Sequence, residues 1–166
     1  MGQVIPSIPE FYAHALAIES EAVQRYREFE AYFTGRGDDV LAGLCHNLAV
    51  LEEEHLEALR KSCEGIELPA VNMAEHGWLA AERDEAAERA FYRVVDARQL
   101  LEIALRSECN ALGFFQWVAT SSPDGSVRSL AHEMAIEEME HVNWVRNAIE
   151  YHLPRDSKAG SPEVSS

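Results

Sequence analysis

Two Glu-x-x-His segments constrain the fold of this chain more than any other sequence feature. They are Glu52–His55 and Glu138–His141, and each lies in the middle of an apolar stripe with helical spacing. Around Glu52, for example, Leu48 and Leu56 occupy the same helix face. Burying an unpaired carboxylate is strongly unfavourable, so a helix that turns such a face inward needs a compensating cation nearby. The chain is therefore expected to fold around a charged or metal-binding centre.

Two more glutamates, Glu19 and Glu108, occupy the same kind of position on other stretches of the chain. Their same-face neighbours are Tyr12, Ala15, Leu16, Ala22, Val23 and Tyr26 for the first, and Leu101, Ala104, Leu105, Ala111, Leu112 and Phe115 for the second. No lysine or arginine shares these stripes near the glutamates. Two divalent metal ions would balance four buried carboxylates. The predicted ligands are Glu19, Glu52, His55, Glu108, Glu138 and His141.

Four long segments have the 3.6-residue apolar period of amphipathic helices, and no segment has the alternation typical of a strand. The first is expected to start at a Ser7-x-x-Glu10 capping box and to end at about Thr34. The other three are predicted from Asp38–Asp39 to near Gly65, from Asp96, capped with Gln99, to Ser122–Pro123, and from Pro123-Asp124-Gly125 to just before Pro154. The predicted fold class is therefore all-α.

The lengths of the connections predict how these helices pair. The first two and the last two are joined by short turns, which favours two antiparallel hairpins. About thirty residues separate Gly65 from Asp96, a length that suits a crossover along a bundle, with a short helix around Glu85–Val95. We expect one four-helix domain over residues 1–153 and a loose tail over residues 154–166.

The two halves of the chain resemble each other. Residues 46–60 align with residues 132–146, with His, Ala, Glu, Glu, His and Arg at equivalent positions. Residues 15–26 align with residues 104–115, which places Glu19 opposite Glu108 and Tyr26 opposite Phe115. The near-equal offsets of the two alignments indicate a duplicated helical hairpin.

The order Glu19, Glu52-x-x-His55, Glu108, Glu138-x-x-His141 resembles the ligand pattern of ferritin-like di-iron carboxylate proteins. The stretch AIESEAVQRY is similar to the first ligand helix of the rubrerythrin branch, and the likeness covers roughly residues 8 to 152. The resemblance implies a ferritin-like four-helix bundle that holds two iron ions, with manganese or zinc as other possible occupants. It also implies a reaction with O2 or H2O2 and electrons from an external donor protein.

Two departures from that family leave the function open. The chain has no paired cysteines for a rubredoxin domain, and Ala111 stands where the family has a further carboxylate three residues after the third-helix glutamate. Three hypotheses follow. The chain is a di-iron oxidase or peroxidase with a separate donor, an Fe(II)-oxidising protein for iron storage or detoxification, or a bundle that metal ions only stabilise.

Several other residues carry alternatives. Tyr26 either hydrogen-bonds a ligand carboxylate or only packs in the core. His46 and His132 are interpreted as ordinary structural residues, with contacts to the ligand side chains as the alternative. Five acidic residues are expected to lie off the apolar stripe in solvent: Glu21, Glu53, Glu54, Glu137 and Glu140. A homodimer is expected, and the candidates for its contacts are Trp78, Trp117 and Trp144, with a place in the core as the alternative for one or more of them.

The composition of the chain limits which partners it can bind and in which cell compartment it is expected. The chain has 29 acidic against 14 basic residues, and this excess argues against binding nucleic acid. No apolar run is long enough for a membrane span, and the first residues do not resemble a signal peptide. Cys45, Cys63 and Cys109 are far apart and are expected to be buried as small hydrophobic residues, which fits a reducing cytoplasm.

Overall fold

The computed structural model describes residues 4–71 and 85–152, and within them the chain forms five helices and no strand. The helices are α1 (Ile8–Gly35), α2 (Asp39–Ser62), α3 (Glu85–Val94), α4 (Ala97–Ser121) and α5 (Gly125–His152). The predicted all-α four-helix bundle is confirmed, and α3 is the short helix expected before the third long one. The predicted tail (154–166), Trp78 and much of the crossover lie outside the described residues.

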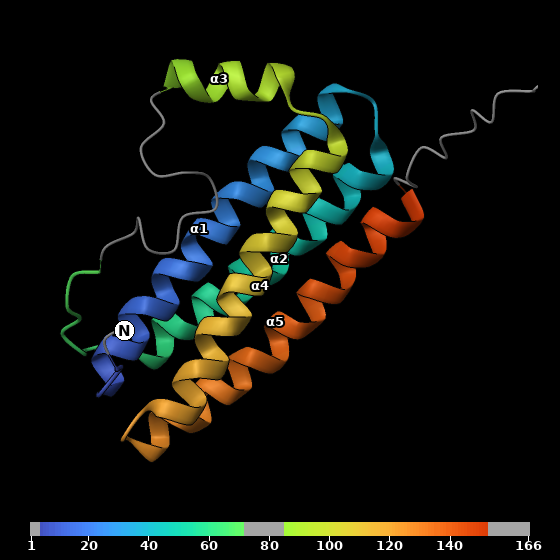
Figure 1. Cartoon of the computed structure of the whole chain (residues 1–166). Helices are drawn as coiled ribbons and strands as arrows, with labels where there is room; N and C mark the ends of the chain where they lie inside the picture. The colour runs from blue at the N-terminus through green and yellow to red at the C-terminus, as the bar shows by residue number, and fades with distance from the viewer. Residues whose placement is uncertain (1–3, 72–84, 153–166) are drawn as a thin grey trace, which may run out of the picture.

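The bundle consists of two antiparallel hairpins, as predicted. α1 packs against α2 and α4 packs against α5 over most of their lengths. Figure 1 shows that α2 and α4 run in the same direction, which requires the long connection between them. The short α1–α2 turn contains Gly37 at φ 73°, a conformation that favours glycine.

Helix α3 lies across the end of the bundle where α1 ends and α4 begins (Figure 1). Its residue Tyr92 donates a hydrogen bond to Glu28 on α1 at 2.8 Å, and its ring packs against Phe29. Just after α3, the backbone oxygen of Val95 accepts a 2.6 Å hydrogen bond from the buried Tyr32 hydroxyl. These contacts fasten the start of the second hairpin to the first.

The helix caps agree with the sequence at the starts of α2 and α4 and differ at the start of α1. The Asp38 side chain accepts a hydrogen bond from the backbone N–H of Leu41 and so caps α2, as predicted. Asp96 and Gln99 form the predicted capping box at the start of α4. The box predicted at Ser7 is wrong, because the Ser7 side chain makes no capping hydrogen bond. Pro9, the second residue of α1, has no N–H, which removes one of the two donors that a capping serine normally uses. The second helix ends at Ser62, slightly before the predicted Gly65.

Two apolar clusters fill the bundle, one towards each end. One contains Tyr26, Phe29, Phe33, Leu41, Leu48, Leu100, Leu101 and Val145, among others. The other contains Phe11, Tyr12, Ile18, Leu59, Phe115, Val118, Val127 and Met134, among others. In all four long helices the predicted ligand positions fall between the residues of the two clusters. A polar layer therefore crosses the middle of an otherwise apolar core.

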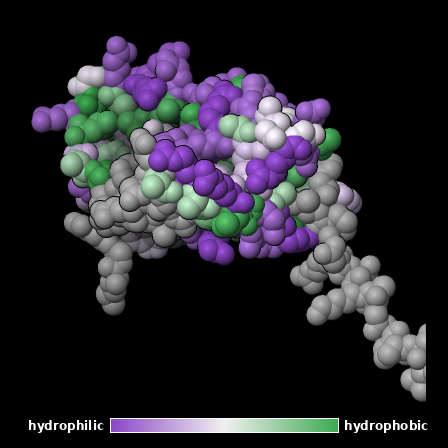
Figure 2. Space-filling view, turned by 90° about the horizontal axis from the view of Figure 1, so that it is seen from above, coloured by the Kyte–Doolittle hydropathy of each residue, from purple (hydrophilic) through white to green (hydrophobic). Residues whose placement is uncertain are grey.

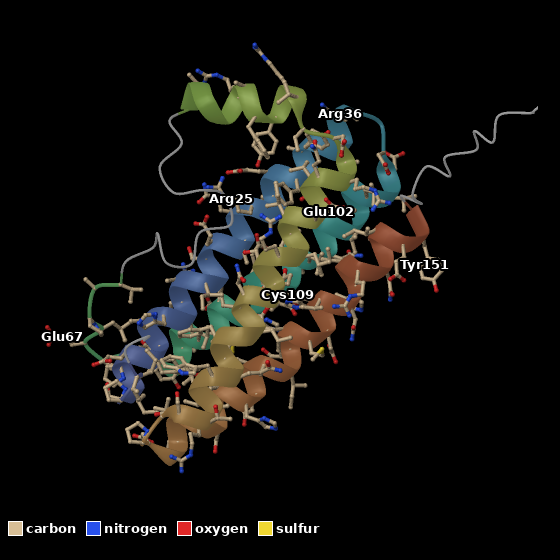
Figure 3. The ribbon with its side chains drawn as sticks, viewed as in Figure 1. Arg25, Arg36, Glu67, Glu102, Cys109 and Tyr151 are labelled. Atoms are coloured by element: carbon tan, nitrogen blue, oxygen red, sulfur yellow. The ribbon has the colours of Figure 1, made fainter. Side chains whose placement is uncertain are left out.

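The cysteines divide between core and surface. Cys45 and Cys63 are buried, as expected. The expectation for Cys109 is wrong, since this residue is exposed on α4 (Figure 3). It directly follows the buried Glu108, and consecutive residues of a helix point in different directions.

The face seen from above in Figure 2 is mainly hydrophilic, with smaller hydrophobic patches. None of the helices in the described part of the chain has the length and apolar character needed to cross a membrane.

The caps yield a stability prediction. Replacing Asp96 by alanine should lower the free energy of unfolding by about 1 kcal/mol, because the N–H of Gln99 loses its acceptor. Ser7→Ala should cost less than half of that, since the side chain caps nothing. Urea unfolding followed by circular dichroism measures both values, and equal losses would contradict the different roles of the two caps.

Candidate metal centre

The six predicted ligands meet in the middle of the bundle. Glu19 comes from α1, Glu52 and His55 from α2, Glu108 from α4, and Glu138 and His141 from α5. All except His55 are at most 2% exposed. The apolar stripe of each helix turns its glutamate inward, and the apolar clusters on either side separate the polar layer from both ends of the bundle.

Three overlapping groups of these residues bring their ligand atoms within 4.8 Å of one another. They are Glu52, His55 and His141; Glu108, Glu138 and His141; and Glu19, Glu52 and Glu138. Each of the six residues belongs to at least one group. The arrangement could hold a metal ion. Whether all six bind metal stays a prediction.

The polar atoms inside this layer are short of hydrogen-bond partners. Both carboxylate oxygens of Glu19 and one oxygen each of Glu52 and Glu138 make no hydrogen bond, nor does Nδ1 of either histidine. Within the described residues, the ligand carboxylates form ion pairs with the two histidines and with neither lysine nor arginine. Buried polar groups normally have hydrogen-bond partners. A cluster of buried oxygen and nitrogen atoms without such partners indicates that another bound group satisfies them.

A metal ion fits this environment. The unsatisfied atoms are carboxylate oxygens and imidazole nitrogens, which are common ligands of divalent metals. They converge from four helices, and because they are buried, water cannot solvate most of the charge. The residues present therefore match a bound cation.

The pKa values of the carboxyl groups also indicate that the site needs a compensating cation. Burial raises the pKa of Glu19 and of Glu138 well above the usual carboxyl range, and repulsion from the neighbouring carboxylates raises both further. Without a metal, these two side chains are therefore driven towards the protonated form. A metal ion would replace those protons.

The pKa values of Glu52 and His141 shift in the directions that favour the charged forms of these two side chains. Burial opposes a charge on Glu52, but its contacts with Glu19 and with His141 bring its pKa below the ordinary carboxyl value. Burial also opposes a charge on His141, yet interactions with Glu108 and Glu52 raise its pKa to about 11. Nδ1 of His141 lies only 2.9 Å from Oε1 of Glu52. A proton on this imidazole thus partly takes the place of a cation.

Tyr26 resolves one of the open alternatives. Its fully buried hydroxyl donates a hydrogen bond to Oε1 of Glu108. Burial and the negative charge of Glu108 raise the pKa of the Tyr26 hydroxyl well above its usual value, so it remains a proton donor. This contact holds one oxygen of Glu108, while Oε2 lies 3.7 Å from Nδ1 of His141.

The two histidines have different surroundings although the sequence repeats them. Their rings stack, with centroids 5.5 Å apart. His55 has a side chain that is 19% exposed, and its Nε2 lies 3.6 Å from the Glu137 carboxylate. His141 is buried, and its ring lies 5.8 Å from the ring of Trp144.

Sequence reasoning missed the contacts of Glu137 and Trp144 with the centre. The Glu137 side chain is 43% exposed, as expected for a residue off the apolar stripe, yet its carboxylate lies 3.6 Å from Nε2 of His55 on another helix. Trp144, a candidate for dimer contacts, is 40% exposed, and Trp117 is partly buried; the dimer itself stays a prediction. The position of Trp144 three residues after His141 is the signal that places it on the same helix face.

Comparison with known proteins supports the fold. One similar solved structure is the crystal structure of an uncharacterized conserved protein from Magnetospirillum magnetotacticum MS-1. It matches with a TM-score of 0.75 and 24% sequence identity, over 96% of this chain and 99% of that one. No protein-family model matches the sequence. No curated protein matches it either.

The raised carboxyl pKa values predict how the metal-free protein responds to pH. Above about pH 5 the unfolded chain has released the protons that native Glu19 and Glu138 still hold, so the free energy of unfolding falls as the pH rises. The raised pKa of His141 acts in the same direction above about pH 7.

Thermal unfolding of chelator-treated protein should therefore give a Tm that falls between about pH 5 and about pH 8. With a divalent metal present the trend should reverse, because the metal binds deprotonated ligands. A metal-free Tm that rises over this range would contradict the buried, proton-holding carboxyls.

The contact between Trp144 and His141 predicts a fluorescence change. Loading the protein with Co(II), which quenches nearby indoles, should lower tryptophan emission, and Trp144→Phe should remove most of that quenching. Trp117→Phe is the matched control, because Trp117 lies more than two helical turns beyond Glu108 on α4. Equal quenching in the two variants would place the metal elsewhere.

Proposed function

We propose that this chain is a di-iron carboxylate protein of the rubrerythrin branch of the ferritin-like family, and that it reduces O2 or H2O2 with electrons from a separate donor protein. The observation that carries this proposal is the buried layer of four glutamates and two histidines, in which several carboxylate oxygens and imidazole nitrogens lack hydrogen-bond partners. The order of these residues along the chain and the two-hairpin bundle support the same assignment.

The proposed pair of ions rests on charge and on ligand distribution. Two Fe(II) ions would balance four carboxylates, and the two Glu-x-x-His segments offer one carboxylate and one imidazole to each ion. Glu52, Glu108, Glu138 and Glu19 supply hard oxygen donors, which suit iron or manganese better than soft metals. Both buried cysteines, Cys45 and Cys63, are absent from the candidate ligand groups.

When bound, iron would supply the two electrons that the reduction of peroxide needs. In the balanced reaction, H2O2 accepts two electrons and two protons, its O–O bond breaks, and two waters form. A one-electron donor protein must then act twice to restore the starting state. In this proposal the one-electron donor is a separate protein.

The chain's own residues would prepare the site for this reaction. The clusters on either side exclude water from most of the layer, which strengthens electrostatic interactions within it. Tyr26 fixes one oxygen of Glu108 and retains its proton. The stacked rings of His55 and His141 hold two nitrogen donors side by side.

Anaerobic titration with Fe(II), followed by addition of H2O2 or air, tests the proposal. We expect about two iron ions per chain and new near-ultraviolet absorption of ferric iron after the oxidant is added. Comparing the rates with the two oxidants identifies the preferred one. Failure to bind iron, or iron that binds and is not oxidised, would overturn the redox function.

A matched pair of variants ties the result to the buried layer. Glu19→Gln should lower the iron content to about one ion per chain or less and slow oxidation by at least about tenfold, because a buried ligand charge is lost. Glu140→Gln removes an equal charge from the exposed face of α5 and should change neither quantity. Native mass measured after oxidation separates a small oligomer from a storage shell.

A further inference from the structure

The polar layer reaches the surface at His55. The other five candidate ligands are at most 2% exposed, whereas the His55 side chain is 19% exposed. Next to it is Glu19, which is fully buried and has two carboxylate oxygens without hydrogen-bond partners. Nδ1 of His55 lies 4.0 Å from Oε2 of Glu19 and 3.7 Å from Oε2 of Glu52. The imidazole therefore stands between solvent and the unsatisfied interior.

On its outer side, the same imidazole faces a carboxylate from another helix. Nε2 of His55 lies 3.6 Å from Oε2 of Glu137 on α5, and the Glu137 side chain is 43% exposed. One His55 nitrogen thus points at buried carboxylates and the other at a solvent-accessible one. A carboxylate in contact with water can bind a hydrated divalent cation without the desolvation cost that the interior imposes.

The duplicated halves differ at this point. In the alignment of residues 46–60 with residues 132–146, Glu137 corresponds to Leu51, and Trp144 corresponds to Ala58. His55 therefore has an acidic neighbour from the opposite half, whereas the equivalent position in the first half is apolar. His141 is instead buried beside Trp144. The two ends of the ligand layer are unequal in access and in charge.

We propose that Glu137 is the access site for metal: it captures a divalent cation such as Fe(II) from solvent and passes it by His55 to Glu19 and Glu52. This inference rests on the proposed metal-binding function and identifies the route by which the centre is filled. The excess of acidic residues raises the local concentration of cations, and Oε2 of Glu137, on a side chain that is 43% exposed, lies 3.6 Å from a candidate ligand. The His141 side fills from within, after the ion has passed His55.

The alternative role for Glu137 is to orient His55 by accepting a hydrogen bond from Nε2, as carboxylates often do for metal-binding histidines. Glu137→Gln distinguishes the two roles. The amide oxygen can still accept that hydrogen bond, but the negative charge that attracts the cation is lost. Orientation alone predicts normal uptake in this variant, whereas cation capture predicts slow uptake.

Metal uptake by the full-length, metal-free protein provides the test. Co(II) is mixed with the protein in a stopped-flow instrument, tryptophan quenching gives the rate, and atomic emission gives the final cobalt content. Glu137→Gln should slow uptake by about tenfold with an unchanged final content, because the charge affects the approach of the ion and not its final ligands. Glu140→Gln, with the same charge change one helical turn further along α5, should stay within about twofold of the unchanged protein.

Each result has a separate meaning. Equal rates for Glu137→Gln and Glu140→Gln would overturn the access role. A lowered final content in Glu137→Gln would also overturn it, since Glu137 would then be a ligand of the bound ion. If the unchanged protein takes up no cobalt and no iron, the proposed metal function itself fails, and this outcome is distinct from a change in rate.

Discussion

The charge of four glutamates buried in the middle of the bundle is the constraint on which the rest of this structure depends. Taking one carboxylate out of water costs several kcal/mol even after relaxation, and a whole domain is stable by only about 5–15 kcal/mol. No lysine or arginine in the described residues is paired with these carboxylates, and the histidines alone compensate only part of the charge. Without metal, the raised pKa values of Glu19 and Glu138 show the alternative response, which is to hold protons.

The architecture around this layer supplies the stability that the layer does not. Aromatic and aliphatic side chains pack at both ends of the bundle, and each of the four long helices contributes to both clusters. Since every helix is held on both sides of its ligand positions, the carboxylates cannot relax towards water without disrupting the packing. The α3 contacts through Tyr92 and Tyr32 fasten the two hairpins together at one end. The packing therefore holds the ligand side chains in place although their carboxylates repel one another.

The near-symmetry of the two hairpins makes their differences informative. The repeat supplies equivalent ligands, yet His55 is partly exposed beside Glu137, and His141 is buried beside Trp144. Tyr26 bonds to Glu108, while its counterpart in the repeat, Phe115, has no hydroxyl with which to hold Glu19. Glu19 accordingly keeps two unsatisfied oxygens on the side of the layer nearer to solvent. The duplicated hairpins thus produced a centre with one accessible and one enclosed side.

The sequence by itself determined the four long helices, the two-hairpin connectivity and the set of six inward-facing polar residues. These follow from helical periodicity and short-range turn chemistry, which act within one stretch of the chain: Glu52 and His55 share a face whatever their helix packs against. Only the tertiary structure decided which groups meet across helices. The Glu137 carboxylate beside His55 joins residues from α2 and α5, and the hydroxyl of Tyr26 reaches Glu108 from α1 to α4. Local spacing carries no information about such pairs, because the relative rotation and height of two helices are set by the packing of the whole core. For the same reason Cys109 is exposed although the sequence predicts its burial: at the edge of an apolar stripe, the neighbouring helices decide which residues they cover.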